Sequence, residues 1–137
     1  MKVVKSSVRG VDSTDSVRSA APAAVAVARW TGGAVAISGE EDLITDGRQL
    51  VFSQGGSEMM PCITGTGCSL GGVMAVYAAV ADPFIAAITG SAFYNLAGTR
   101  AAAHAKGTGS FQTDFIDELY VATPDAIAQN PLTVEEA

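Results

Sequence analysis

Histidine and cysteine are scarce in this 137-residue chain, and its last part contains no basic residue. His104 is the only histidine, and Cys62 and Cys68 are the only cysteines. A zinc site built from His and Cys ligands, a Ser-His-Asp triad and a disulfide scaffold therefore all lack parts. Six of the 14 Asp and Glu residues follow Lys106, which leaves eight acids to balance the eight Lys and Arg of residues 1–106. The chain thus offers no basic patch to neutralise phosphates, and nucleic acid is not an expected partner.

Charged residues make up only 16% of the chain and hydrophobic residues 48%, so a folded core is expected. Residues 59–81 and 83–99 carry no charge, and their lengths alone would suit membrane-spanning helices. Small and polar residues dominate both stretches, which weakens insertion, so we expect buried helices and no membrane partner; a small membrane-associated protein is the alternative. The first residues are charged without an apolar core, so no signal peptide is predicted. Because two cysteines do not make a disulfide scaffold, a reducing cytoplasm is the expected location.

The amino-terminal part of the chain predicts a helix, a buried strand and a hairpin within one domain. A helix capped by Ser13 or Asp15 is expected to run to Trp30, whose side chain would pack over the helix end. The apolar run Ala34–Ser38 lies between two glycines and is typical of a strand buried on both faces. Two short strands then flank Asp46-Gly47, which is a strong hairpin signal. This order of elements indicates an α/β layered fold.

The carboxyl-terminal part predicts an extended segment over residues 59–64 and three helices. The expected helices are Cys68–Ala81, Pro83–Lys106 with Asp82 as its cap, and the amphipathic segment 111–120. One face of the last helix carries its apolar residues, namely Phe111, Phe115, Ile116, Leu119 and Tyr120. Residues 1–12 are expected to form an irregular lead-in, and the acidic tail 123–137 is expected to be flexible.

The sharpest local feature is the glycine-rich segment 64–72, TGTGCSLGG, which precedes the first of these helices. Glycines let consecutive N–H groups converge, and a helix N-terminus adds positive potential, so the segment suits a phosphate or a developing anion. The same potential favours the thiolate of Cys68. The segment is neither a Walker A loop nor a dinucleotide fingerprint, because no Gly-Lys-Ser/Thr follows it and it does not open a βαβ unit. Structural alternatives are a plain turn before a helix and a Cys68 buried as a small apolar residue.

Three other groups of polar residues have structural interpretations. Cys62 is expected in a strand or the core, and His104 on the surface near a helix end. Glu40, Glu41 and Asp42 could bind magnesium, but three acids after a strand are more typical of a solvated loop.

Four segments, RGVDSTDS, AISGEEDLITDG, TGTGCSLGG and KGTGSFQTDFIDELY, resemble in order and spacing the carboxyl-terminal portion of hydroxyethylthiazole kinase. The resemblance runs from residue 10 to residue 120, and a cysteine in GTGC is particular to this family among ribokinase-like enzymes. It implies a ribokinase-like α/β fold, a partial three-layer sandwich with a short central sheet and flanking helices, of which residues 13–122 form the carboxyl-terminal portion. It also implies ATP-dependent phosphorylation of the alcohol of 4-methyl-5-(2-hydroxyethyl)thiazole, with Mg²⁺, in thiamin salvage.

The resemblance assigns roles to individual residues. Gly65, Thr66 and Gly67 would form an anion hole for the transferring γ-phosphoryl group, and Gly65 would also contact the thiazole alcohol. Cys68 would take the proton of that alcohol, and Ser38 would contact ATP. The resemblance assigns no metal ligand in this chain.

The family's domain begins well before this chain does. Its first half carries much of the substrate pocket, an Arg that meets phosphate and an Asn-x-x-Glu motif for magnesium. The resemblance therefore implies a homo-oligomer, since the family assembles as a trimer with sites between subunits, or a partner chain that supplies the missing half. The alternative is a truncated, inactive remnant that acts as a nucleotide-binding or oligomerising module.

Overall fold

A computed structural model describes residues 16–137 of the chain. In chain order the elements are α1 (Val17–Thr31), β1 (Val35–Ile37), β2 (Asp42–Thr45), β3 (Gln49–Ser53), the 3₁₀ helix η1 (Met60–Cys62), α2 (Thr66–Ala78), α3 (Pro83–Ala102), α4 (Thr108–Val121), α5 (Pro124–Ala128) and β4 (Leu132–Glu136).

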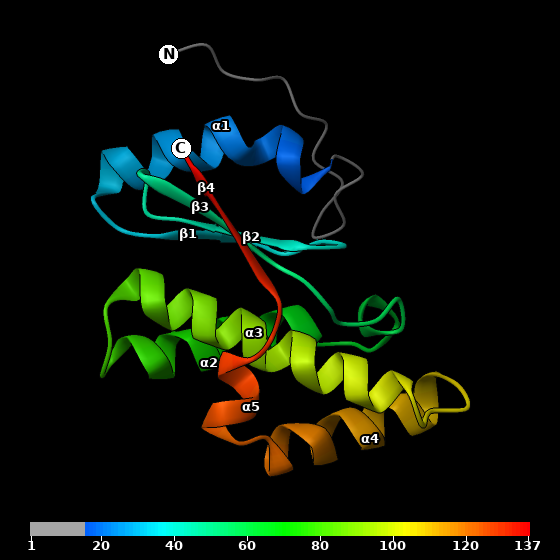
Figure 1. Ribbon diagram of the computed structural model, residues 1–137. Coiled ribbons are helices and arrows are strands. Elements are labelled where there is room, and N and C mark those ends of the chain that lie inside the picture. The colour runs from blue at the N-terminus through cyan, green and yellow to red at the C-terminus, as the bar shows by residue number, and fades with distance from the viewer. Residues whose placement is uncertain (1–15) are drawn as a thin grey trace.

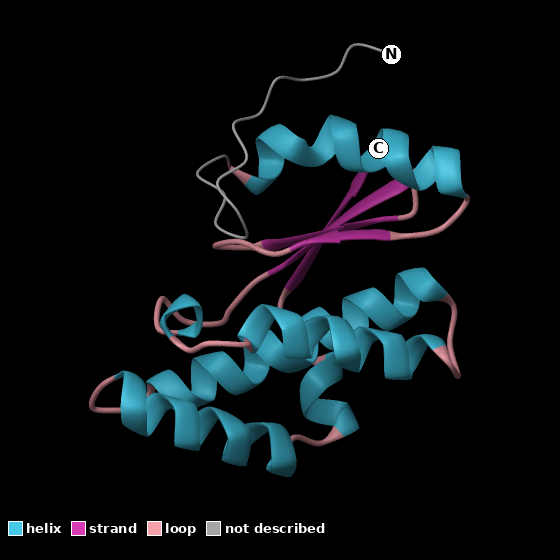
Figure 2. Ribbon diagram, turned by 180° about the vertical axis from the view of Figure 1, so that it is seen from behind, coloured by secondary structure: helices cyan, strands magenta, loops and turns pink. Residues whose placement is uncertain are grey.

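The elements form three layers. The four strands make one sheet in the order β1-β2-β3-β4, and each neighbouring pair is antiparallel. Helix α1 covers one face of this sheet, and α2, α3, α4 and α5 gather on the other face (Figures 1 and 2). The predicted α/β sandwich, with a short central sheet flanked by helices, is confirmed.

Helix α1 begins and ends through local capping. The Ser16 hydroxyl accepts a hydrogen bond from the Ser19 N–H at 3.2 Å, and Gly32 takes a left-handed conformation after the last turn. The predicted caps Ser13 and Asp15 lie outside the described residues, as does the predicted lead-in. Trp30 does not pack over the helix end as predicted, because its side chain is 86% exposed on the solvent face.

The predicted hairpin is confirmed, since β2 and β3 pair in register across Asp46-Gly47. Asp46 accepts hydrogen bonds from the N–H groups of Arg48 and Gln49 at 2.8 and 2.9 Å, which fixes the turn locally. Strand β1, however, is not buried on both faces. It lies at the sheet edge with β2 as its only partner among the described strands, and its middle residue Ala36 is exposed. The strand with every residue buried is β2, because it lies between two strands and two helical layers.

Apolar side chains fill the spaces between the layers. Ala24 of α1 packs against Leu43 and Phe52 on one face of the sheet. On the other face, Ala87 of α3 packs against Ile44 and Val51. A further cluster joins the helices to one another; its buried members are Ile63, Leu70, Tyr94, Ala97, Ala101, Phe111 and Phe115.

The three helices predicted after the hairpin are present as α2, α3 and α4, with shifted ends. Helix α2 begins at Thr66, before the predicted Cys68, and α3 ends at Ala102, before the predicted Lys106. Asp82 caps α3 as predicted, because its carboxylate accepts from the Phe84 N–H at 2.9 Å. The segment predicted to be extended over residues 59–64 instead contains η1.

The predicted apolar face of α4 is only partly buried. Phe111 and Phe115 lie in the core, where the Phe115 ring meets Tyr94 edge-on at 5.4 Å between ring centroids. Ile116 and Tyr120 are 58% and 91% exposed. The prediction that they share the buried face was wrong, because α4 packs on α3 along one narrow stripe.

The structure gives residues 124–136 a short helix and a strand instead of the predicted flexible tail. Strand β4 pairs antiparallel with β3 from Leu132 opposite Ser53 to Glu136 opposite Gln49. Asn130 anchors the turn before β4, since its buried amide donates to the Gln54 carbonyl at 2.9 Å. The acidic composition did not reveal this strand, because its order comes from backbone pairing with β3 and its side chains stay exposed.

Candidate active site

Strand direction brings two separate segments to one end of the sheet. Strands β1 and β3 are both antiparallel to β2, so their carboxyl ends lie at the same end of the sheet. Ser38 follows β1, and the segment that leads through η1 to α2 follows β3. Figures 1 and 2 show both segments on the same side of the molecule, above the start of α2.

The glycine-rich segment forms a tight turn into α2. Gly65 has a φ of 94°, a left-handed conformation that glycine adopts freely, and a Cβ atom there would meet no atom within 4 Å. Ser69 is the first residue of α2 whose N–H donates within the helix, to the Gly65 carbonyl at 2.9 Å. In the described part of the chain, the N–H groups of Thr66, Gly67 and Cys68 have no hydrogen-bond partner. Three unpaired donors at a helix N-terminus suit an anion.

The side chain of Thr66 holds this turn against η1. Its hydroxyl lies 3.2 Å from the Met60 carbonyl oxygen and 3.1 Å from that of Ile63, and it donates to this pair. The hydroxyl therefore faces the protein interior, and the backbone N–H of Thr66 is the group left free for a ligand.

Cys68 is exposed and carries a free thiol in the first turn of α2. Burial as a small apolar residue, the structural alternative, is therefore wrong. Cys62 is exposed too, on η1, and not in a strand or the core as predicted; its thiol contacts the Glu58 carbonyl at 3.7 Å. The two cysteines differ in surroundings, because only Cys68 adjoins the unpaired N–H groups.

Ser38 is exposed directly beyond β1 and makes no hydrogen bond with residues 65–68 in the part of the chain described. Gly65, Thr66, Gly67 and Cys68 are thus brought together by sequence, and Ser38 shares only their end of the sheet. Only a ligand that contacts both Ser38 and residues 65–68 would join them into one site.

A buried polar cluster underlies this end of the sheet, and the sequence did not predict it. Its members are Asp42, Ser53, Ser91, Asn95 and Asn130, all at most 7% exposed. Desolvation by burial raises the pKa of Asp42, while hydrogen bonds from Ser91, Gly39 and Asn95 oppose that rise. Asp42 is therefore not part of a solvated loop. The available signal was Ser91 and Asn95, two polar residues four apart in a helix that is apolar over most of its length.

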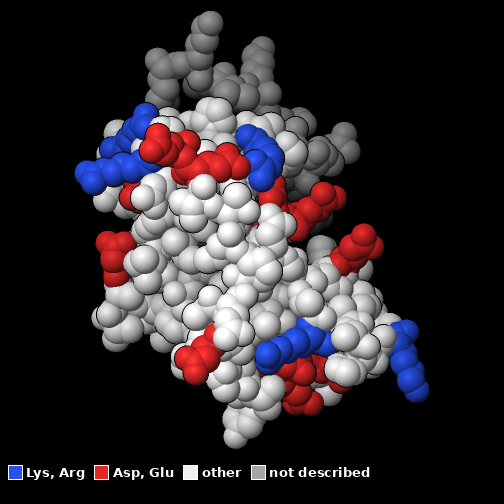
Figure 3. Space-filling view, in the orientation of Figure 1, with Lys and Arg blue, Asp and Glu red and all other residues white. Residues whose placement is uncertain are grey.

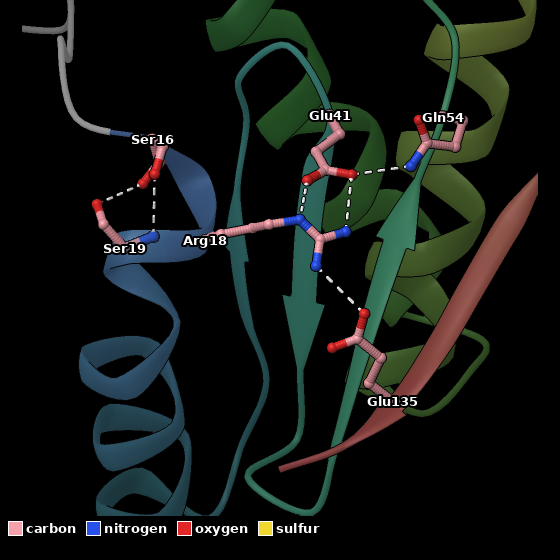
Figure 4. A network of polar contacts seen from close by, with 6 residues as sticks. All are labelled: Ser16, Arg18, Ser19, Glu41, Gln54 and Glu135. Carbon is pink, nitrogen blue, oxygen red and sulfur yellow. Dashed lines mark hydrogen bonds and ion pairs between the residues drawn. The ribbon is translucent and has the colours of Figure 1, made fainter.

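On the opposite face, Glu41 joins a second polar network (Figure 4). Arg18 donates to both carboxylate oxygens of Glu41, at 2.7 and 3.3 Å, and to Glu135 at 3.2 Å. Gln54 donates to Glu41 at 2.8 Å. The hydrogen bonds from Arg18 lower the pKa of Glu41. Residues 41 and 42 are thus held from opposite faces of the sheet.

The described residues do not form a metal site by themselves. Among residues 16–137, no three His, Cys, Asp or Glu side chains come close enough to hold an ion. Glu41 is engaged by Arg18, and Asp42 is buried among neutral donors. Within residues 16–137 we therefore assign no magnesium ligand.

Charge is unevenly spread over the surface. On the face in Figure 3, acidic and basic side chains intermingle over the sheet and α1 and again at the far end of the helical layer, with a broad uncharged band between them. Two stretches of the chain, residues 59–81 and 83–99, carry no charge, which accords with this band. No helix within residues 16–137 combines the length and apolar character needed to span a bilayer.

Comparisons with known proteins all point to the same family. Residues 1–125 match the sequence profile of the hydroxyethylthiazole kinase family. The hydroxyethylthiazole kinase of Bifidobacterium animalis subsp. lactis (strain AD011) is 48% identical over 130 residues, which are 90% of this chain and 43% of that protein. The enzyme of the same name from Gemmatimonas aurantiaca is 45% identical over 117 residues, or 85% of this chain and 42% of that protein.

A solved structure supports the same assignment. The hydroxyethylthiazole kinase protein from Pyrococcus horikoshii OT3 aligns with a TM-score of 0.77 and 28% sequence identity, over 88% of this chain and 47% of that one. The predicted ribokinase-like fold is confirmed, and the chain spans less than half the length of the relatives it matches. By sequence and by fold, the chain belongs to the hydroxyethylthiazole kinase family.

Proposed function

We propose that this chain carries the phosphoryl-transfer portion of a hydroxyethylthiazole kinase, which uses ATP to phosphorylate the alcohol of 4-methyl-5-(2-hydroxyethyl)thiazole in cytoplasmic thiamin salvage. The observation that carries the proposal is the turn at Gly65, where three unpaired N–H groups adjoin an exposed thiol. Family membership supplies the substrate class, since the relatives are named for this alcohol.

In this proposal the alcohol oxygen attacks the γ-phosphorus of ATP. A new P–O bond forms, the bond between the γ-phosphorus and ADP breaks, and the alcohol proton passes to Sγ of Cys68. The N–H groups of Thr66, Gly67 and Cys68 stabilise the charge that collects on the transferring group. Their positions are fixed before substrate binds, because Gly65 and the Thr66 hydroxyl hold the turn.

Ser38 is assigned to the nucleotide, and Gly65 also to the thiazole alcohol. The support for Ser38 is its exposure at the same end of the sheet as the turn. Magnesium would neutralise charge on the nucleotide phosphates, as in other phosphoryl transfers. Its protein ligands are assigned to the half of the family domain that this chain does not match.

The surface of α2 supports an assembly with another chain or another copy. The helix contains no charged residue, yet Leu70 is its only buried residue and Val76 is 72% exposed. A helix that is apolar all round is normally covered all round. We therefore propose that a second copy, or a partner carrying the other half of the domain, covers this face. Light scattering on the purified chain and on its Val76→Lys variant tests self-assembly. A wild-type chain that is monomeric in this measurement would argue against it.

The kinase proposal is tested by ADP release from the purified chain with ATP, magnesium and hydroxyethylthiazole. Cys68→Ala is expected to lower kcat by about 10²- to 10⁴-fold, the usual contribution of a general base. Cys62→Ala is the matched control, because Cys62 is also an exposed free cysteine but lies away from the unpaired N–H groups. Its kcat should stay at the wild-type value.

Three outcomes separate the hypotheses. Thiazole-dependent turnover that Cys68→Ala alone abolishes supports the kinase. Nucleotide binding without turnover, in a chain that unfolds cooperatively, supports the inactive module. Equal losses in both cysteine variants would contradict the role of Cys68.

A further inference from the structure

Asp42 is a buried carboxyl group that only neutral donors surround. It is 6% exposed, and none of the described Lys or Arg side chains pairs with it. One oxygen accepts from the Gly39 N–H at 3.2 Å; the other accepts from the Ser91 hydroxyl and from the Asn95 amide at 3.1 Å. Burying a carboxyl group without a cation is costly, and an apolar residue would pack at less cost. The arrangement therefore calls for an explanation beyond packing.

The first partner, Gly39, belongs to the loop assigned to the nucleotide. Gly39 directly follows Ser38, and residues 38–41 connect β1 to Asp42 at the start of β2. The Gly39 N–H is the only described backbone group of residues 38–40 that donates a hydrogen bond. Among the described side chains, Asp42 is therefore the one that holds the backbone of the Ser38 loop by a hydrogen bond.

The other two partners lie on α3, which also holds the segment after β3. Ser91 and Asn95 are one helical turn apart, and Thr99 follows one turn later on the same face. The Gly56 N–H lies 3.0 Å from the Asn95 carbonyl and 3.0 Å from the Thr99 hydroxyl. A Cβ atom at Gly98 would approach Cα of Gly56 to 3.1 Å, so this segment lies directly on α3.

The contacts continue to the phosphate turn. Four residues beyond Gly56 is Met60, whose carbonyl accepts from Thr66. One face of α3 therefore fixes both segments that meet at the end of the sheet: the Ser38 loop through Asp42, and the Gly65 turn through Gly56 and η1. The distance between the two segments depends on both connections.

We propose that Asp42, held by Ser91 and Asn95, is a positioning residue that places the Ser38 loop relative to the Gly65–Cys68 turn, so that both can contact one nucleotide. The proposal rests on the proposed kinase function, because it takes the nucleotide as the ligand of both segments. Asp42 acts through Gly39 and does not itself touch the ligand.

Asparagine cannot take over this role, although it has the same shape as aspartate. All three partners of Asp42 are donors, and a carboxylate accepts from all of them. The NH₂ group of an asparagine would face either the Gly39 N–H or the Asn95 NH₂. Asn95 cannot simply turn its amide over, because its Nδ2 also donates to the Ser53 carbonyl oxygen at 3.4 Å, and a carbonyl oxygen can only accept.

The test compares nucleotide affinity in three variants of the full chain. Asp42→Asn replaces one acceptor oxygen of residue 42 with a donor. Ser91→Ala removes one of the donors to Asp42 and leaves residue 42 unchanged, so it keeps the proposal testable if Asp42→Asn does not fold. Thr45→Val is the matched control, because Thr45 is also buried and lies at the opposite end of the same strand. The change removes two hydrogen bonds, from the Thr45 hydroxyl to the Gln49 carbonyl at 2.6 Å and from the Gly47 N–H to the Thr45 hydroxyl at 3.0 Å. Calorimetric titration with ADP and magnesium gives each dissociation constant, and amide hydrogen exchange reports on the Gly39 N–H.

The dissociation constant is expected to rise about three- to tenfold in Asp42→Asn and Ser91→Ala, the range for loss of one hydrogen bond, and by less than twofold in Thr45→Val. Exchange of the Gly39 N–H should accelerate in the first two variants only. Equal affinity in all four proteins, or equal loss in all three variants, overturns the positioning role. A wild-type chain that binds no ADP overturns the kinase proposal itself, and this inference with it.

Discussion

Arg18 donates two hydrogen bonds to the carboxylate of Glu41, from Nε at 2.7 Å and from Nη2 at 3.3 Å. The pair joins the first turn of α1 to the residue that precedes β2, and Figure 4 shows Glu135 and Gln54 completing the network. The Arg18 guanidinium also lies over the Phe52 ring, with Cζ 3.9 Å from the ring centroid. One side chain therefore connects the helix above the sheet with the loop at its end and with the last strand.

Glu41→Gln is expected to lower the free energy of unfolding at pH 7 and to have no effect in strong acid. Arg18 lowers the pKa of Glu41 below its ordinary value of 4.5, so the folded state favours the ionised form. The stabilisation is present above pH 4.5 and is lost as the pH falls through the depressed pKa. Urea denaturation at several pH values measures it, and a gap between wild type and Glu41→Gln that does not close in acid would contradict the pairing.

Asp42 is expected to show the opposite pH dependence. Burial raises its pKa above the ordinary value of 3.8, so over the interval between the two pKa values the folded state binds more protons than the unfolded state. Its contribution is therefore most favourable at low pH and is lost as the pH rises through the raised pKa. The free energy of unfolding of wild type minus that of Asp42→Asn should increase as the pH is lowered from 7; a constant difference would mean that burial does not perturb this group.

Features set by neighbours in sequence could be predicted, and those set by distant contacts could not. The Asp46-Gly47 turn, the Asp82 cap and the glycine-rich segment depend on residues a few positions apart. The burial of Asp42 depends on Ser91, 49 positions away, and the strand of the acidic tail depends on β3. Nothing local distinguishes such residues from a solvated loop or a flexible end.

The same distinction applies to the candidate site. Gly65 to Cys68 are consecutive, so a local pattern indicated them as a unit. That Ser38 lies at their end of the sheet follows from the directions of β1 and β3, which the sequence pattern left undetermined. The local pattern indicated an anion-binding segment, and the specific chemical roles of all five residues came from family resemblance; these roles stay predictions.

Asn130→Ala tests whether the carboxyl-terminal segment belongs to the fold. The Asn130 amide is buried and donates to the Ser53 hydroxyl at 3.2 Å and to the Gln54 carbonyl at 2.9 Å. Its removal is expected to lower the free energy of unfolding by about 1–3 kcal/mol, because buried acceptors lose their donor. Gln129→Ala, at an exposed neighbouring position, should stay within about 0.5 kcal/mol of wild type. Equal, small effects would restore the interpretation of a flexible tail.

Gly65→Ala tests the conformation on which the anion site depends. At a φ of 94° an alanine is strained, and the substitution is expected to lower the free energy of unfolding by about 1–2 kcal/mol. No atom lies within 4 Å of the new Cβ, so the loss would come from the backbone and not from a clash. If the variant relieves the strain by rotating the peptide at residue 65, the N–H groups of Thr66, Gly67 and Cys68 would no longer point toward one anion. The affinity for the nucleotide phosphates should then fall as well.

Gly71→Ala is the control for this change. Gly71 lies inside α2 and is exposed, and a Cβ atom there would also meet no atom within 4 Å, but its φ is not left-handed. Alanine there is expected to raise the free energy of unfolding by about 0.5–1 kcal/mol, because it loses less backbone entropy than glycine in a helix. Opposite signs for two Gly→Ala changes six residues apart would establish the left-handed turn at Gly65, since composition and helix propensity alone give both the same sign. Two stabilising changes would mean that α2 begins before Gly65 and that the three N–H groups are not free.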